Sequence, residues 1–250
     1  MSKTVLITGA TAGFGAAIAR TFAADGWKLA ITGRRKERLE ALADELGGPE
    51  KVFIMPFDIR DEAATRDALA NLPPEFAEID VLVNNAGLAL GTGPIDASDL
   101  QDWKTMIDTN ITGLVTITRL LIDTLIARKG LIVNLASVAS NWAYPGSNVY
   151  GGTKAFVQQF SLGLRSDLSA RGVRVTSIEP GMAESEFTLV RTGGDKAAYD
   201  KLYGGANPLQ PEDIARTIHW VATQPPHVNI NSLEIMPVSQ SWAPFQVART

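Results

Sequence analysis

The chain has 250 residues, of which 45% are hydrophobic and 20% charged, and its formal charge at pH 7 is −4. This mildly acidic balance, without a basic stripe, argues against nucleic acid as a main partner. The absence of cysteine excludes disulfides, thiolate catalysis and cysteine-ligated zinc. The two histidines, His219 and His227, lack the paired spacing of a metal motif, so no metal site is expected.

The N-terminal segment reaches Gly9 before the apolar core of a signal peptide could form. No window approaches about 18 uninterrupted apolar residues, the length that a membrane-spanning helix needs. We therefore expect no membrane association and a cytoplasmic location.

Short aliphatic runs alternate with longer segments of helical periodicity along the chain. Most of these runs are apolar throughout, as in parallel strands that helices cover on both faces. Strands are expected at residues 4–8, 28–32, 51–56, 81–84, 131–135, 174–178 and 233–236, and helices at 13–25, 36–46, 62–71, 100–128, 149–170 and 211–224. The sequence thus predicts a single doubly wound Rossmann-type α/β domain over residues 1–250, with a seven-stranded, mostly parallel sheet.

Two segments, residues 88–99 and 181–207, interrupt this alternation. Residues 182–207 contain four glycines and are interpreted either as a mobile substrate lid or as a plain surface excursion. Residues 239–250 form a C-terminal tail after the last strand.

The first strand leads into a glycine-rich turn, residues 9–15, and then into an alanine-rich helix. Glycines at such a turn let backbone N–H groups approach a pyrophosphate, whose charge the helix N-terminus favours. The spacing is Gly-x3-Gly-x-Gly and differs from the common Gly-x-Gly-x-x-Gly fingerprint. Its position between a strand and a helix nevertheless predicts a dinucleotide site.

Arg34 and Arg35 follow the second strand, where an NAD site usually carries an acidic residue for the ribose 2′-hydroxyl. A guanidinium can bind an added 2′-phosphate through two hydrogen bonds, so NADP is favoured over NAD. The alternative is that both arginines begin a solvated helix with Lys36 and Arg38.

Six elements occur in order along the chain: the glycine-rich turn, the run Asn84-Asn85-Ala86-Gly87, Asn110, Ser137, the pair Tyr150-x3-Lys154, and Pro180-Gly181. Each alone is a weak signal. Together they resemble the short-chain dehydrogenase/reductase family over essentially the whole chain. The resemblance implies an enzyme that transfers a hydride between a nicotinamide cofactor and a substrate carbon.

Tyr150 and Lys154 stand four residues apart on one expected helix, so both side chains project from the same face. A free phenol titrates near pH 10, and a neighbouring ammonium favours the phenolate. We expect Lys154 and the oxidised nicotinamide together to lower the pKa of Tyr150. The resemblance implies that Tyr150 exchanges the substrate proton while Ser137 hydrogen-bonds the same oxygen. It also implies that Lys154 holds the nicotinamide ribose and that Asn110 keeps a water-linked relay in place.

Further cofactor contacts rest on the resemblance alone. Asp58 would lie near the adenine, and Asn84 and Ala86 near the adenosine ribose. Ser185 stands where the family commonly has threonine, and it keeps the hydroxyl near the carboxamide. The full expected cofactor set is Gly9, Thr11, Gly13, Phe14, Gly15, Arg34, Arg35, Asp58, Asn84, Ala86, Gly87, Tyr150, Lys154, Pro180, Gly181 and Ser185.

Within the family, residues 84–91, 148–156, 186–191 and 229–234 resemble NADP-dependent serine 3-dehydrogenases and related 3-hydroxy acid and allo-threonine dehydrogenases. This implies reversible oxidation of the β-hydroxyl of small 3-hydroxy acids, with L-serine as the lead substrate. A carboxylate needs a cation, which Arg191 could supply. The expected substrate set is Ser137, Trp142, Tyr144, Tyr150, Arg191 and Gln240, in which Gln240 adds a neutral donor and the two aromatics wall the pocket. Arg191, Gln240 and these aromatics also have ordinary surface or packing interpretations.

Several alternatives stay open. Arg191 would hold a sulfonate equally well, so reduction of sulfoacetaldehyde to isethionate is the nearest one. An oxoacyl reductase acting on a carrier protein would need a basic docking patch that this acidic chain does not show. A non-catalytic NADP-binding regulatory or scaffold protein would be expected to lack part of the Asn, Ser, Tyr and Lys set. The resemblance also implies a homotetramer built on helices 100–128 and 149–170, with Trp242 and Phe245 of the tail packing across subunits.

Overall fold

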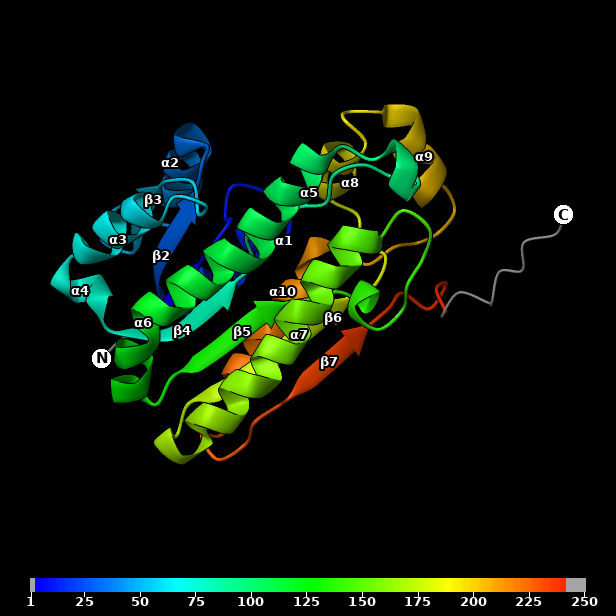
Figure 1. Ribbon diagram of the computed structural model, residues 1–250. Helices are drawn as coiled ribbons and strands as arrows, with labels where there is room; N and C mark the ends of the chain where they lie inside the picture. The colour runs from blue at the N-terminus through cyan, green and yellow to red at the C-terminus, as the bar shows by residue number, and fades with distance from the viewer. Residues whose placement is uncertain (1–2, 242–250) are drawn as a thin grey trace, which may run out of the picture.

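The seven aliphatic runs pair into one sheet, shown in Figure 1 for the computed structural model, which describes residues 3–241. Among the described residues every strand pair is parallel, in the order β3-β2-β1-β4-β5-β6-β7. The strands are β1 (Thr4–Ile7), β2 (Lys28–Gly33), β3 (Val52–Pro56), β4 (Ile79–Asn84), β5 (Leu131–Leu135), β6 (Arg174–Pro180) and β7 (Ser232–Ile235). All seven expected strands are confirmed, and the sheet is fully rather than mostly parallel.

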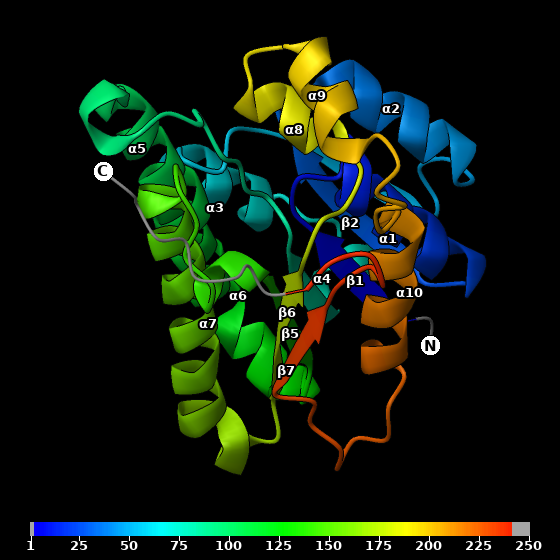
Figure 2. The same cartoon turned by 90° about the vertical axis from the view of Figure 1, so that its right-hand side faces the viewer.

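Helices cover both faces of this sheet, as the end-on view in Figure 2 shows. On one face lie α1 (Gly13–Ala24), α2 (Lys36–Glu45) and α10 (Pro211–Ala222), which share a core with the sheet. On the other lie α3 (Glu62–Ala70), α6 (Leu114–Arg128) and α7 (Asn148–Leu168). Strands with helices on both faces can be apolar along their whole length, which explains the uniform hydrophobicity of the runs.

The long helix expected over residues 100–128 is not uniform. It consists of α5 (Leu100–Ile107), one π-helical turn (Asp108–Gly113) and α6. Among the described residues, Leu100–Arg128 is also the one helical run whose length and composition would let it cross a membrane. In the structure its Ile117 and Leu125 are fully buried against the sheet.

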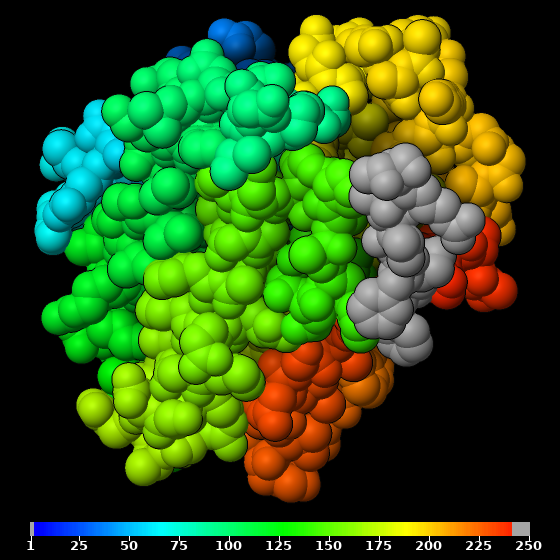
Figure 3. Space-filling view, turned by 45° about the vertical axis from the view of Figure 1, so that its right-hand side comes forward, coloured from blue at the N-terminus to red at the C-terminus, as the bar shows by residue number. Residues whose placement is uncertain are grey.

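Residues 182–207 contain two helices that the sequence did not predict, α8 (Glu186–Arg191) and α9 (Lys196–Tyr203). A short α4 (Pro74–Ala77) was missed as well. In Figure 3 the α8–α9 segment, in yellow, stands at one end of the molecule beside the blue-green chain near α5. The backbone N–H of Gly91 donates to the carbonyl of Arg191 there, which joins the two segments directly.

The strand order determines where a crevice opens along the sheet. From β1 the chain winds outward through β2 to β3, and then returns to start the other half of the sheet at β4. The connections after β1 and β4 therefore leave the sheet in opposite directions and open a crevice at the carboxyl ends of these strands.

Candidate active site

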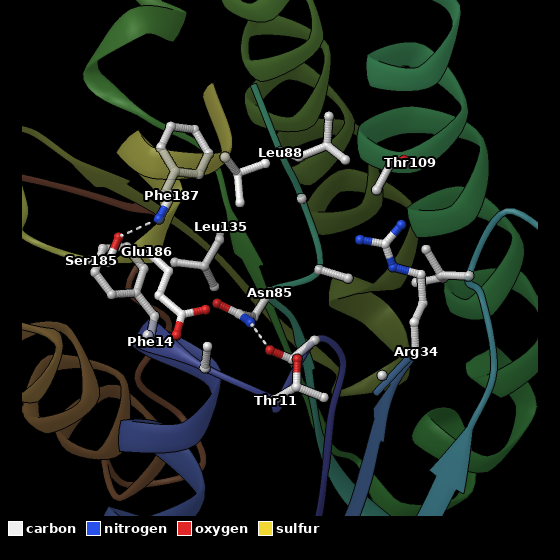
Figure 4. Close-up of a pocket in the computed structure, with 18 of the residues that line it drawn as sticks. Thr11, Phe14, Arg34, Asn85, Leu88, Thr109, Leu135, Ser185, Glu186 and Phe187 are labelled. Carbon is white, nitrogen blue, oxygen red and sulfur yellow. Dashed lines mark hydrogen bonds between the residues drawn. The ribbon is translucent and has the colours of Figure 1, made fainter. Parts of the chain in front are cut away.

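A cavity of about 290 Å³ occupies this crevice (Figure 4). Its walls come from the segments that follow β1, β2, β3, β4, β5 and β6, together with α7 and α8. The expected residues that line it are Gly9, Thr11, Gly13, Phe14, Arg34, Arg35, Asp58, Ala86, Gly87, Ser137, Tyr150, Lys154, Pro180, Gly181 and Ser185. Most of the residues expected to bind a cofactor or to catalyse thus meet in one cavity.

The glycine-rich turn is packed too tightly for side chains. Gly9 has a φ of +71°, and a Cβ there would lie 2.9 Å from the Cα of Ala86. A Cβ on Gly15 would lie 2.3 Å from the carbonyl oxygen of Gly9, so Gly15 serves the packing of the turn and does not line the cavity. The amide of Asn85 donates to the carbonyls of Thr8 and Gly9 at 2.8 and 3.1 Å and ties the turn to the end of β4.

Asn84 does not lie where the resemblance put it. It is 3% exposed, and its amide donates to Thr118 of α6 and Asn134 of β5 at 2.8 Å each. The physical reason is strand alternation, since successive side chains of β4 point to opposite faces. It is Asn85, the next residue, that lines the cavity.

Both arginines after β2 reach the cavity wall. Arg35 donates to the Thr11 hydroxyl at 2.7 Å, which places its guanidinium against the glycine-rich turn. Asp58 lies beside them, and its hydrogen bonds from Arg60 hold the pKa of its carboxyl below the usual range, so it is ionised. A glycine-lined turn flanked by two guanidinium groups suits a dinucleotide with an extra phosphate.

Ser137, Tyr150 and Lys154 come together where the chain leaves β5 and where α7 begins. Ser137 follows β5, and its hydroxyl accepts the N–H of Ala139 at 3.1 Å and makes a side-chain hydrogen bond with Tyr150. Lys154 donates to the carbonyl of Leu135 at 2.7 Å, and its ammonium nitrogen lies 5.9 Å from the centroid of the Tyr150 ring. The serine, tyrosine and lysine therefore share one buried corner of the cavity.

Burial dominates the protonation of Tyr150 and Lys154. Burial raises the pKa of Tyr150 to about 12, and the hydrogen bond from Ser137 and the charge of Arg191 offset this only in part. Burial also lowers the pKa of Lys154 to about 8. Desolvation disfavours each charged form. The lowering of the Tyr150 pKa by Lys154 and the oxidised nicotinamide together stays a prediction.

Asn110 lies in the π-helical turn and is 1% exposed. Its amide donates to the carbonyl of Leu88 at 2.8 Å, and its oxygen accepts the N–H of Leu88 at 2.9 Å. A Cβ added to Gly87 would lie 3.2 Å from the Asn110 oxygen and 3.4 Å from the Lys154 nitrogen. Asn110 thus adjoins Lys154 behind the cavity wall and fixes the loop after β4.

The expected substrate residues separate into two groups. Arg191, at the end of α8, donates to the Tyr144 hydroxyl at 2.8 Å and to the carbonyls of Gly91 and Gly146 at 3.2 Å each. Its guanidinium carbon lies 5.6 Å from the centroid of the Tyr150 ring. Arg191 and Tyr144 therefore lie near Tyr150, although neither belongs to the cavity lining itself.

Trp142 and Gln240 are placed differently. Trp142 is 43% exposed and donates to Glu234 on β7 at 2.9 Å. It does not line the cavity, contrary to the expectation. The side-chain oxygen of Gln240 accepts the N–H of Met182 at 2.6 Å, which makes Gln240 a brace for the turn after β6. Residues 242–250, with Trp242 and Phe245, lie outside the described part of the chain.

Glu186, Phe187 and Val190 of α8 also line the cavity, and the sequence assigned no role to any of the three; Figure 4 labels the first two. The Phe187 ring centroid lies 5.7 Å from that of Tyr150. Glu186 is bonded to Arg35 and Arg38 across the cavity mouth. The sequence signal for this part of the cavity was the resemblance of residues 186–191 to serine 3-dehydrogenases, which assigned no task to any of these residues.

A strand–glycine turn–helix unit that shares one cavity with a Ser–Tyr–Lys group defines a dinucleotide-dependent oxidoreductase. The family model described as short chain dehydrogenase matches residues 3–192, and the chain belongs to that family. The expectation of an enzyme of this family is confirmed.

Several known proteins are similar over their whole length. A serine 3-dehydrogenase of Agrobacterium fabrum is 65% identical, covering 100% of this chain and 99% of that protein. Sulfoacetaldehyde reductase 2 of Chromohalobacter salexigens is 57% identical with full coverage of both, and an NADP-dependent 3-hydroxy acid dehydrogenase of Salmonella typhi is 52% identical over 98% of this chain and 99% of its own. A solved closed form of a serine dehydrogenase complexed with NADP⁺ superimposes with a TM-score of 0.96 at 51% identity, covering 99% and 100% of the two chains.

Proposed function

We propose that this protein is an NADP-dependent dehydrogenase that reversibly oxidises the β-hydroxyl of small 3-hydroxy acids, with L-serine as the lead substrate. One observation carries the proposal: the Arg191 guanidinium lies 5.6 Å from the ring of Tyr150, whose hydroxyl is bonded to Ser137. In a 3-hydroxy acid the carboxylate is two carbons from the reacting hydroxyl. A cation beside the proton-exchanging tyrosine therefore matches the geometry of the substrate.

The proposed mechanism assigns one task to each side chain. Ser137 and Tyr150 hydrogen-bond the substrate oxygen, and Tyr150 accepts its proton during oxidation or donates it during reduction. NADP, when bound, supplies the site that takes or gives the hydride, and a positive charge in its oxidised form. Lys154 would hold the ribose hydroxyls, and Asn110 fixes the loop beside it through its two hydrogen bonds with Leu88.

Burial of the Tyr150 phenol favours one direction of the proposed reaction, the reduction of the carbonyl. With a pKa near 12, Tyr150 keeps its proton at neutral pH and is ready to act as the acid in carbonyl reduction. Oxidation of the alcohol requires the phenolate, which needs additional positive charge near the ring. Arg191 contributes to this, since its charge lowers the pKa of Tyr150.

The cofactor would lie along the cavity, with its pyrophosphate at the glycine-rich turn and its 2′-phosphate at Arg34 and Arg35. Pro180, Gly181 and Ser185 would flank the nicotinamide end. The α8–α9 segment would act as the lid, because α8 carries the groups that face both ends of the cavity, Glu186 and Arg191.

We also propose a homotetramer in the cytoplasm. Apolar side chains are exposed along the outer faces of α5 and α7, among them Ile107, Phe156 and Leu162 at 41%, 37% and 43%. The α7 surface faces the viewer in Figure 3. Burial of such a face between subunits is the usual role of an apolar patch on a helix pair. A monomeric mass in light scattering at micromolar concentration would contradict the assembly.

The second candidate is a sulfoacetaldehyde reductase, because the same cation would hold a sulfonate and because one similar protein carries that name. The deciding experiment compares kcat/KM for L-serine, L-allo-threonine and 3-hydroxypropionate with NADP⁺ against NADPH-driven reduction of sulfoacetaldehyde. A dominant hydroxy acid supports the proposal. A lead of tenfold or more for sulfoacetaldehyde would reassign Arg191 to a sulfonate and replace the proposed substrate.

A further inference from the structure

One carboxylate of the proposed lid, that of Glu186, is hydrogen-bonded to Arg35, one of the two arginines assigned to the cofactor phosphate. Glu186, the first residue of α8, accepts hydrogen bonds from Arg35 at 3.2 Å and from Arg38 at 2.9 and 3.0 Å. These partners are separated by about 150 residues of chain, so the contact joins α8 to the segment that follows β2. Figure 4 shows Glu186 and Arg34 entering the cavity from opposite sides.

The charge on Glu186 is retained. Partial burial opposes its ionisation, but the hydrogen bonds from Arg38 and Arg35 outweigh this effect and hold the pKa of its carboxyl below the usual range. Arg35 itself is shared between two partners, the Thr11 hydroxyl at 2.7 Å and Glu186 at 3.2 Å. Thr11 belongs to the glycine-rich turn, so a phosphate that binds Arg35 at this turn arrives next to the carboxylate.

We propose that Glu186 is a specificity-determining residue for the cofactor, which competes with the 2′-phosphate for Arg35 and so couples the substrate lid to the identity of the dinucleotide. This rests on the proposed NADP site at Arg34 and Arg35. When the 2′-phosphate takes Arg35, Glu186 stays with Arg38 alone. A dinucleotide without that phosphate leaves both arginines to Glu186.

The size of the effect follows from the charges. A 2′-phosphate carries about −1.5 to −2 near neutral pH. A carboxylate within several ångströms repels it in a site that is half exposed and screened by salt. Removal of that carboxylate should strengthen NADPH binding about fivefold at low ionic strength and leave NADH binding unchanged, because NADH has no 2′-phosphate.

The test measures dissociation constants of NADPH and NADH by fluorescence titration, without substrate, for the full chain and three variants. Glu186→Gln should tighten NADPH about fivefold, with the gain shrinking as salt is added. Glu184→Gln is the matched control, because it removes an equal charge two residues before Glu186. The Glu184 carboxylate accepts hydrogen bonds from Tyr199 and Gln210 and from no arginine side chain among the described residues. This control should leave the ratio of the two constants as it is in the wild type.

Arg35→Gln, the third variant, separates this proposal from the cofactor assignment. If this change abolishes the preference for NADPH but Glu186→Gln does not alter it, the competition is wrong and the phosphate site stands. If Arg35→Gln leaves the preference intact, the assignment of the phosphate to Arg35 fails first. An equal change in both cofactors on Glu186→Gln would also overturn the proposal, since a lid contact alone would act on both.

Arg38 offers an independent check. Arg38→Gln frees Glu186 to bind Arg35 more fully, so it should weaken NADPH in the wild-type background and have little effect in the Glu186→Gln background. Equal weakening in both backgrounds would mean that Arg38 does not act through Glu186, and would overturn the competition.

Discussion

The guanidinium carbon of Arg191 lies 5.6 Å from the ring centroid of Tyr150 and 5.4 Å from that of Tyr144. Three of the five N–H groups of an arginine are used here on Tyr144, Gly91 and Gly146. Arg191 therefore joins the end of α8 to the segments around Gly91 and Tyr144. Its remaining donors are the ones proposed to bind the substrate carboxylate.

Replacement of Arg191 by alanine should lower kcat/KM for L-serine by one to two decades, since a hydrogen bond to a charged group contributes about 1.5–3 kcal/mol. A neutral secondary alcohol should lose much less. Arg191→Lys keeps the charge but lacks the planar guanidinium that binds three partners. Its kcat/KM for L-serine should therefore lie between those of the wild type and Arg191→Ala. Steady-state kinetics on both substrates checks this, and an unchanged ratio between them would remove Arg191 from substrate recognition.

Tyr150→Phe deletes the group proposed to exchange the proton but keeps the ring that packs on Phe187. We expect turnover to fall at least about 100-fold while NADPH binding is retained. Rapid mixing and fluorescence titration measure the two quantities separately. A variant that loses cofactor binding to the same extent would show that the hydroxyl serves binding and not chemistry.

The pH dependence should differ between the two directions. The raised pKa of Tyr150, about 12, keeps the phenol protonated across the neutral range, so the reduction rate should be nearly flat there. Oxidation needs the phenolate, whose fraction grows with pH, so its rate should rise toward alkaline pH. Initial rates measured in both directions with one buffer series test this. An oxidation rate that falls with rising pH would contradict the role of Tyr150 as base.

The change of both Arg34 and Arg35 to glutamine should weaken NADP⁺ binding far more than NAD⁺ binding, because only the former carries the 2′-phosphate. Both arginines line the cavity, and Arg35 is fixed on Thr11. Calorimetric titration with each cofactor gives the two constants. Equal losses would mean that the arginines support the turn and not the phosphate.

The strands and the main helices could be predicted because strands covered on both faces are uniformly apolar and helices show one apolar stripe. The helix α8 could not, since its six residues lie in a polar, glycine-rich segment and are held by distant partners such as Arg35 and Gly91. The sequence also could not distinguish Asn84 from Asn85, because a shift of one residue along a strand reverses the face. The direction of the Tyr150 pKa depends on burial, which the four-residue spacing to Lys154 does not reveal.

Lys154 offers a last test, in which activity and stability should move in opposite directions. Burial lowers its pKa from 10.5 to about 8, so below pH 8 the folded protein carries an ammonium that is better solvated in the unfolded chain. At about 1.36 kcal/mol per pKa unit, this costs roughly 3 kcal/mol of folding free energy. Lys154→Met removes that cost and loses the charged hydrogen bond to the Leu135 carbonyl, worth about 1.5–3 kcal/mol. We therefore expect the variant to be inactive and up to about 1.5 kcal/mol more stable at pH 7.

The sign of this effect sets its pH window. The unfolded chain binds more protons than the folded one between the two pKa values, so wild-type stability rises with pH from about 8 to 10.5 as the cost disappears. The advantage of Lys154→Met should accordingly shrink across that range. Urea unfolding at pH 7 and at alkaline pH, followed by circular dichroism, measures it. The control is Lys129→Met, on a residue whose exposed position carries no such burial cost, and it should leave stability nearly unchanged at both pH values. A Lys154→Met variant less stable than the wild type at pH 7 would show that the ammonium is compensated inside the fold by more than its bond to Leu135.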